Sequence, residues 1–151
     1  METKLQAEAG VQDVDSQLMK ICRKLAIVEA NVELLSKMTR NCVATEDVRS
    51  FMDNQRSKHG VKKSLNKRAI KSVMGQKFRD ACMVASRLRQ DRCRLRKECR
   101  KKVPSRDWKQ IEKEMEDKVR EWKNDKRVRN NKKYENCIRK QERIDAYKKS
   151  G

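Results

Sequence analysis

The sequence predicts an all-α protein of extended helices, with an N-terminal heptad coiled coil, little compact core and partly disordered basic segments. Ala, Glu, Lys, Arg and Leu supply 70 of the 151 residues, a composition typical of long helices and coiled coils. Four Gly and one Pro leave little material for tight turns or multi-stranded sheets. Leu, Ile, Val and Phe together number 28, and the net charge is +19. So few large apolar residues supply too little apolar surface for a large compact core.

Apolar spacing and helix-breaking residues divide the chain into seven segments. We expect a disordered N-terminus (1–10), a coiled-coil oligomerisation helix (11–42), a short helix and linker (45–60), a basic helix (61–103), an amphipathic helix (105–127), a C-terminal helix (131–147) and a tail (148–151). Pro104 should stop the basic helix, because its ring removes a donor and restricts Val103 to extended backbone. Ser105 is the expected N-cap of the helix that follows.

A heptad repeat of apolar residues runs through the first helix. Its members recur at alternating steps of three and four, which predicts an oligomerisation seam. They are Val11, Val14, Leu18, Ile21, Leu25, Val28, Val32 and Leu35. Ile27 and Leu34 lie outside the seam and indicate a second packing face. A dimer, a trimer and an intramolecular helix bundle all fit, so the partner is another copy, another helical protein or the chain itself.

The C-terminal third has its own apolar face. Trp108, Ile111, Met115, Val119 and Trp122 share one side of a helix over four turns. The two tryptophans could stack on nucleic-acid bases, but we expect them to pack in the core. A last helix is expected to begin at Asn130 and Asn131, with Tyr134, Ile138, Ile144 and Tyr147 roughly aligned along it.

The excess charge is concentrated in the middle of the chain. Residues 1–55 carry a net charge of −2, residues 56–104 carry +15, and residues 105–151 carry +6. This asymmetry indicates a nearly neutral part that assembles and a basic part that meets a polyanion.

The densest run of cations covers residues 87–102, where nine of sixteen side chains are basic. These are Arg87, Arg89, Arg92, Arg94, Arg96, Lys97, Arg100, Lys101 and Lys102. A phosphate backbone would relieve their mutual repulsion and release counterions, and Arg binds phosphate through its planar fork. In composition the run resembles the arginine-rich helices that enter RNA grooves. We therefore expect non-enzymatic nucleic-acid binding, with RNA favoured over DNA.

Other uses of such a basic run stay open at this point. A protein-interaction scaffold that binds an acidic partner is the main alternative. A nuclear import signal and a solvated helix face are further possibilities. A site for acidic lipid is the least favoured, because no aromatic or Leu-rich face accompanies the charges.

Catalytic and metal chemistry find little support in the sequence. There is no Gly-rich phosphate loop and no nucleophile near a His, and His59 stands 17 residues from the nearest Cys. We expect no catalytic, cofactor-binding or metal site, no small-molecule substrate, and six reduced thiols that fill small apolar spaces. The N-terminus lacks the pattern of a secretory signal and no apolar stretch approaches about 20 residues, so a nuclear or cytoplasmic protein is expected, neither secreted nor membrane-spanning.

Four stretches occur in a suggestive order: 32–37 (Val-Glu-Leu-Leu-Ser-Lys), the Arg-rich 87–102, Val103-Pro104, and 131–135 (Asn-Lys-Lys-Tyr-Glu). In this order the chain resembles the helical basic region ahead of the polymerase in retrotransposon polyproteins of invertebrates. The resemblance covers about residues 30–140. It implies that an assembling chain binds the element's own RNA. Polymerase, protease, integrase and zinc-knuckle motifs are missing, so the resemblance implies no enzymatic activity.

Overall fold

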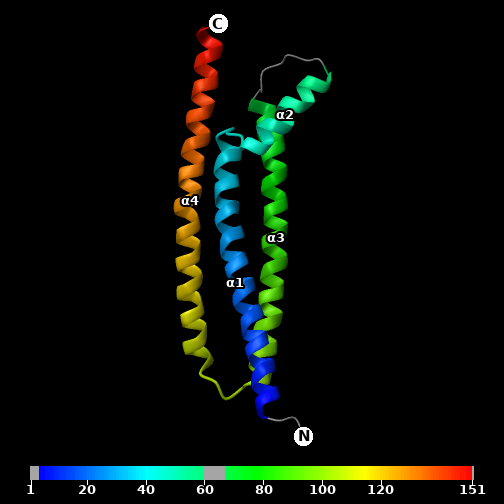
Figure 1. Cartoon of the computed structure of the whole chain (residues 1–151), viewed down its shortest axis with the longest axis vertical. Helices are drawn as coiled ribbons and strands as arrows, with labels where there is room; N and C mark the ends of the chain where they lie inside the picture. The colour runs from blue at the N-terminus through cyan, green and yellow to red at the C-terminus, as the bar shows by residue number, and fades with distance from the viewer. Residues whose placement is uncertain (1–3, 60–66, 151) are drawn as a thin grey trace.

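The computed structural model describes residues 4–59 and 67–150, which form four helices (Figure 1). Helix α1 spans Lys4–Arg40, α2 spans Glu46–His59, α3 spans Lys67–Lys102 and α4 spans Trp108–Ser150. Strands are absent from these residues, and the predicted all-α class is confirmed. Side-chain burial is described for residues 14–55, 67–147 and 149, so the seam residue Val11 lies outside it.

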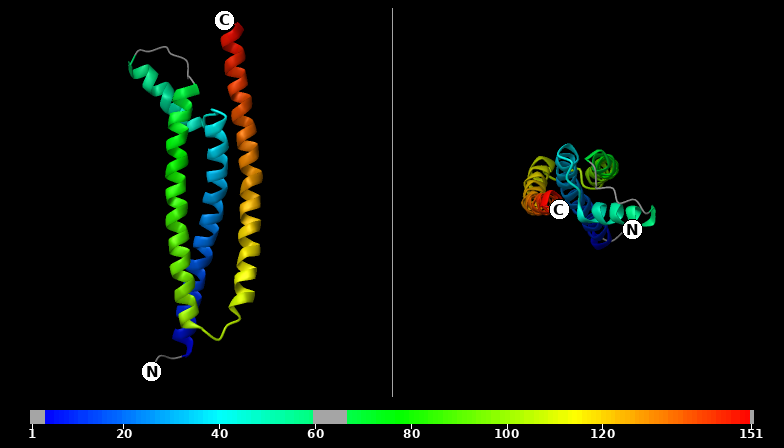
Figure 2. Two further views of the ribbon diagram at one scale, coloured as in Figure 1. Left: turned by 180° about the vertical axis from the view of Figure 1, so that it is seen from behind. Right: turned by 90° about the horizontal axis from the view of Figure 1, so that it is seen from above.

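The three long helices lie side by side with α1 in the middle (Figures 1 and 2). α3 packs antiparallel along one side of α1, and α4 packs along another side in the same direction as α1. The short α2 leaves the end of α1 at an angle and leads towards the start of α3. The helix predicted to join with a partner is therefore packed against the rest of its own chain, which is one of the arrangements the sequence allowed.

The buried stripe of α1 follows a period of four rather than a heptad. Its members are Val14, Leu18, Cys22, Ala26, Ala30, Leu34 and Met38. Four residues turn a helix by about 400°, so this stripe winds gradually around α1 and serves neighbours on two sides. The small side chains in its middle let neighbouring helices approach closely. Of the predicted seam, Val14, Leu18 and Leu25 are buried, whereas Ile21, Val28, Val32 and Leu35 are half-buried.

Two apolar clusters stabilise the helices near their two ends. The first surrounds Leu34 and Met38 of α1, Ile70 and Met74 of α3, and Tyr134 of α4. The second joins Leu18 and Cys22 of α1 to residues of α3 and α4. Its members from these two helices are Leu95, Cys99 and Met115, with Trp108, Ile111, Val119 and Trp122 packed against them. The predicted packing of the tryptophan face is thus confirmed.

α1 ends in a Schellman turn that has a cysteine where glycine is usual. Cys42 has a φ of 54°, in the left-handed region. Its N–H donates to the Thr39 carbonyl at 3.3 Å, and the N–H of Val43 donates to the Met38 carbonyl at 2.9 Å. Val43 and Met38 are both buried, which supplies the apolar contact that accompanies this motif. The turn directs the chain from α1 into α2.

The break between α3 and α4 falls at Pro104, as predicted, but the N-cap differs. Asp107, not Ser105, caps α4: its Oδ1 accepts the Gln110 N–H at 3.3 Å. The indole N–H of Trp108 donates to the Val103 carbonyl at 2.9 Å, and α4 begins at Trp108 itself. This hydrogen bond favours a helix start at Trp108, and the residue before it, Asp107 and not Ser105, is then the N-cap.

α4 is continuous through the point where the sequence suggested two helices. Asn130 and Asn131 do not start a new helix. Instead, the buried Asn130 side chain donates to Oδ1 of Asn31 on α1 at 3.2 Å. Asn130 thus forms a hydrogen bond between two helices, and it lies inside α4 although asparagine is more common at the start of a helix.

The period-four stripe makes α1 sensitive to added volume at its small residues. We expect Ala26→Leu to lower the free energy of unfolding by about 1–3 kcal/mol, because Ala26 is buried and a larger side chain must force packed helices apart. Chemical denaturation measures this loss. The same change at exposed Ala146 is the control and should have little effect. Equal stability of the two variants would contradict the close packing along α1.

Gly75 in α3 has room for a side chain although it is buried. A Cβ placed there would lie 3.7 Å from Nη1 of Arg79 and 3.9 Å from Cγ2 of Thr39, which are ordinary contact distances. We expect Gly75→Ala to raise the free energy of unfolding by about 0.5–1 kcal/mol, because alanine restricts the unfolded chain and favours helix. Thermal denaturation tests this gain. A loss of stability would mean that α1 lies closer to Gly75 than the structure shows.

Candidate nucleic-acid interface

The nine predicted cations of residues 87–102 do not form one surface. They lie on different sides of α3, and the structure divides them into three groups. Arg89, Arg94, Arg100 and Lys102 have carboxylate partners. Arg92 and Arg96 are half-buried, and Arg87, Lys97 and Lys101 are exposed without a carboxylate partner among the described residues.

The paired cations help to hold the protein together. Nε of Arg89 lies 3.7 Å from a carboxylate oxygen of Glu29 on α1, and Arg100 pairs with Glu112 on α4. The other two pairs are within α3: Arg94 lies 3.3 Å from Asp91, and Lys102 lies 3.8 Å from Glu98. These contacts are at least partly exposed, and such pairs contribute little each. Arg89 and Arg100 are nevertheless committed to other helices.

Arg92 and Arg96 face the interior between α1 and α3. Burial raises the pKa of the Cys22 thiol, while the positive charges of Arg96 and Arg92 oppose this shift. Nε of Arg96 is buried and has no hydrogen-bond partner. These two of the nine predicted cations are therefore poorly placed to reach a long polyanion.

Four of the exposed cations lie along one side of α3. Arg87, Arg94, Lys97 and Lys101 are all exposed, at steps of seven, three and four. These steps bring them to nearly the same side of the helix, over about 21 Å of its length. Exposed Gln90 lies in the same stripe between Arg87 and Arg94. We call Arg87, Arg94, Lys97 and Lys101 the outer stripe.

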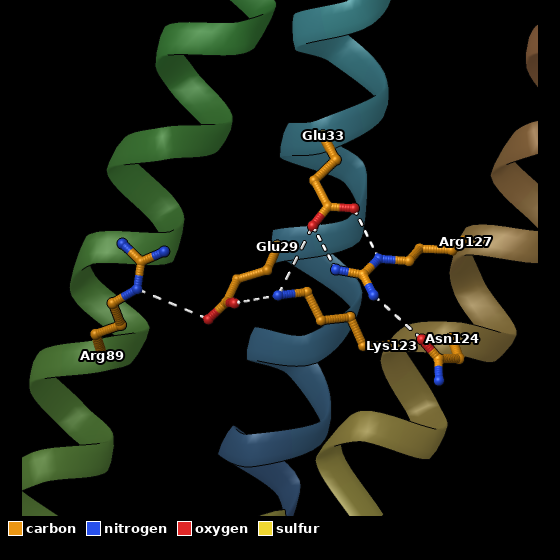
Figure 3. Close-up of polar contacts among 6 residues, drawn as sticks. All are labelled: Glu29, Glu33, Arg89, Lys123, Asn124 and Arg127. Atoms are coloured by element: carbon orange, nitrogen blue, oxygen red, sulfur yellow. Dashed lines mark hydrogen bonds and ion pairs between the residues drawn. The ribbon is translucent and has the colours of Figure 1, made fainter.

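A compact charge cluster joins the three long helices at mid-length (Figure 3). Glu33 of α1 accepts two hydrogen bonds from the Arg127 guanidinium, at 2.7 and 2.8 Å. Lys123 lies 2.8 Å from Glu29 and 3.8 Å from Glu33, and Arg89 approaches Glu29 from the opposite side. Two acidic side chains of α1 therefore attract cations from both flanking helices.

Sequence reasoning overlooked a second group of cations, in the distal half of α4. Residues 126–149 hold ten basic and three acidic side chains, whereas residues 107–125 hold five basic and seven acidic. In the net charge of the whole C-terminal third, the acidic half offsets part of the charge of the basic half. A shorter charge window would have found the basic half. Within it, Arg129, Lys132 and Lys133 are exposed and have no carboxylate partner among the described residues.

The described part of the chain gives no sign of a metal site or a membrane span. Within residues 4–59 and 67–150, no group of three or more His, Cys, Asp or Glu side chains is arranged to hold a metal ion. No helix in these ranges is both long and apolar enough to cross a bilayer. Cys22, Cys99 and Cys137 are buried, and burial raises the pKa of Cys99, with the Asp15 carboxylate adding to this rise.

Comparisons with known proteins return no match among family models, curated proteins or solved structures. The resemblance to a retrotransposon polyprotein region stays a prediction. The interface must therefore be argued from the residues and their surroundings alone.

The charge cluster predicts a specific pH dependence of stability. The Arg127 hydrogen bonds lower the pKa of Glu33 below its ordinary value of 4.5, with the charges of Arg127 and Lys123 adding to the effect and partial burial opposing it. Because the folded protein holds the Glu33 carboxylate at a lowered pKa, this carboxylate stabilises the fold at pH values above its ordinary pKa. The contribution is lost as the pH falls through the lowered pKa of the folded protein. Glu33→Gln should therefore destabilise the protein at pH 7 and have a smaller effect near pH 3.

Denaturation at several pH values measures this difference. Glu142→Gln is the matched control, since Glu142 is exposed and has no ion pair among the described residues. A loss in Glu33→Gln that is independent of pH would show that the charge of Glu33 is not what holds α1 to α4.

Proposed function

We propose that this protein binds nucleic acid without catalysis, RNA in preference to DNA, and that the outer stripe of α3 contacts the phosphate backbone. The observation that carries the proposal is the separation of the α3 cations into two roles. Within residues 87–102, Arg89 and Arg100 pair with Glu29 and Glu112, and Arg92 and Arg96 are half-buried. The four cations of the outer stripe project into solvent along one side of α3, and Lys102, which pairs with Glu98, lies outside the stripe.

The dimensions of the outer stripe suit a phosphate backbone. Phosphates follow one another every 3.4 Å along the axis of one duplex strand, so about 21 Å of helix passes about six of them. Arg87, Lys97 and Lys101 have no carboxylate partner among the described residues, and the Arg94 pair with Asp91 is exposed and weak. Binding would release counterions from the nucleic acid at little cost to the fold.

Helix stability supports the use of α3 as a rigid binding element. Arg89 and Arg100 are tied to α1 and α4, and Leu95 and Cys99 are buried in the core. The outer cations are therefore held in position before a ligand arrives. Such preorganisation lowers the entropy that would be lost on binding.

Self-association through α1 is a further part of the proposal, because two stripes on one assembly would multiply a modest affinity. Leu18 and Leu25 are buried within the chain, so a second copy would have to contact the half-buried Ile21, Val28 and Val32. Sedimentation of the protein over a range of concentrations tests this part separately. A constant monomer mass would contradict it.

The stripe itself is tested by salt-dependent binding. We expect the change of Arg87, Arg94, Lys97 and Lys101 to Gln to flatten the slope of log K against log salt by up to about 3 units on single-stranded RNA, at about 0.7 per lost phosphate contact. Fluorescence anisotropy with a labelled RNA that carries a 5′-hydroxyl, over a salt series, gives the slope. A labelled DNA duplex shows whether RNA is preferred.

The matched control changes Lys109, Lys113, Lys118 and Arg120 to Gln, which removes the same charge from exposed positions in the acidic half of α4. This variant should flatten the slope by less than about 1 unit. Equal effects in both variants would show diffuse attraction by net charge instead of a stripe. Unchanged binding in both would overturn the nucleic-acid proposal.

A protein scaffold that binds an acidic partner is the second candidate. Met83 is 57% exposed and Val84 is 46% exposed on α3, about one turn before Arg87. Apolar side chains beside a basic stripe suit a protein ligand better than a phosphate backbone. An acidic polypeptide that binds tightly at high salt and loses affinity in Met83→Gln would favour the scaffold.

A further inference from the structure

A pocket of about 590 Å³ lies where the start of α2 faces the distal half of α4. Its walls include Arg49, Arg129, Lys132 and Lys133, together with Glu46 and Asp47 from the first turn of α2. This volume is within the range of pockets that hold small ligands. The outer stripe of α3 contributes nothing to it, so the pocket is a separate feature of the molecule.

The decisive residue is Arg49, whose charge is buried without a counter-charge. Arg49 is only 5% exposed. Nη2 donates to the Cys137 carbonyl at 3.3 Å and to Oε1 of Gln141 at 2.8 Å, both of them neutral acceptors. Nε and Nη1 have no hydrogen-bond partner, and no carboxylate of the described residues pairs with this guanidinium. Burial of an unpaired charge is costly, and an anion bound in the adjoining pocket would offset part of that cost.

The two acidic residues of the pocket do not supply that anion, because both are already engaged. Glu46 pairs with Lys140 at 3.1 Å. Asp47 binds Lys77 of α3 and accepts from the Thr45 hydroxyl, and chiefly the Lys77 hydrogen bond lowers the pKa of Asp47 to about 2. At neutral pH neither carboxylate is left to neutralise Arg49. The pocket keeps an excess of positive charge.

The opposite wall provides three further cations at helical spacing. Arg129, Lys132 and Lys133 follow one another on the pocket side of α4, and none has a carboxylate partner among the described residues. The pocket is also lined by the first residues of α2, the end of a helix where the dipole favours negative charge. Planar Arg and mobile Lys donors together match the several oxygens of a phosphate group.

We propose that this pocket binds a phosphoryl group, held between Arg49 at the start of α2 and Arg129, Lys132 and Lys133 of α4. The group belongs either to a free nucleotide or to the phosphorylated end of a nucleic-acid strand. The inference rests on the pocket alone and does not depend on the outer stripe.

The first test uses inorganic pyrophosphate as the probe and isothermal titration calorimetry at constant ionic strength. The double variant Arg129→Gln/Lys132→Gln should bind pyrophosphate at least ten-fold more weakly than the unmodified protein. Lys109→Gln/Lys113→Gln removes the same charge from exposed positions of α4 outside the pocket and should change the affinity less than two-fold. Equal losses in both variants, or no binding by the unmodified protein, would overturn the proposal.

Arg49→Met separates binding from a structural role. If Arg49 is kept for an anion, removal of the buried charge should abolish pyrophosphate binding and leave the melting temperature of the unliganded protein unchanged or higher. Unchanged affinity with a lowered melting temperature would show that Arg49 only supports the fold. If this variant does not fold, the pair at Arg129 and Lys132 still decides the question.

The source of the phosphoryl group is distinguished with two more probes. ATP is compared with pyrophosphate, and a short RNA with a 5′-phosphate is compared with the same RNA carrying a 5′-hydroxyl. A ten-fold preference for the phosphorylated end that disappears in the double variant assigns the pocket to strand ends. Equal binding of the two RNAs together with tight binding of ATP assigns it to free nucleotides.

Discussion

The structure depends on one nearly neutral helix that lies between two strongly basic ones. α3 and α4 each pack along α1, and together they carry most of the positive charge of the chain. Without an acidic surface between them, the two would repel each other at the separation that the fold requires. Glu29 and Glu33 supply that surface at mid-length, and Asp15 supplies it near the α3–α4 turn, where it lies 2.8 Å from Arg106. The apolar stripe of α1 and the carboxylates of α1 thus both contact α3 and α4.

This arrangement sorts the cations by their distance from α1. Several side chains that face α1 are paired within the molecule, as Arg127 is with Glu33 and Lys123 is with Glu29, and these pairs join the helices to each other. Side chains that face away keep their full charge and are held on rigid helices. The outer stripe of α3 and the pocket beside α2 are two products of this sorting. Neither requires the partly disordered basic segment that the composition suggested, because α3 is helical throughout Lys67–Lys102.

The sequence predicted the features that depend on local chemistry. The all-α class followed from composition, the break at Pro104 from the missing donor, and the burial of the Trp108 and Trp122 face from helical spacing. The period-four stripe was overlooked because Cys22, Ala26 and Ala30 are small and do not stand out in an apolar pattern. Their importance depends on how closely another helix approaches, which is set by residues far along the chain. The role of each cation was hidden for the same reason: Arg89 and Lys97 look alike until Glu29 is seen opposite one of them.

The central position of α1 has a consequence for how the chain is made. α1 is synthesised before α4, and its partner Arg127 lies 94 residues after Glu33, while Asn130 lies 99 residues after its hydrogen-bonded neighbour Asn31. For a helical protein these are long sequence separations, and folding rates fall as such separations grow. α3 can cover one side of α1 early, but the side that packs on α4 stays uncovered until α4 has been synthesised. A nascent chain of this kind is exposed to aggregation at that side of α1 for longer than a protein whose helices all pack in the order of their synthesis.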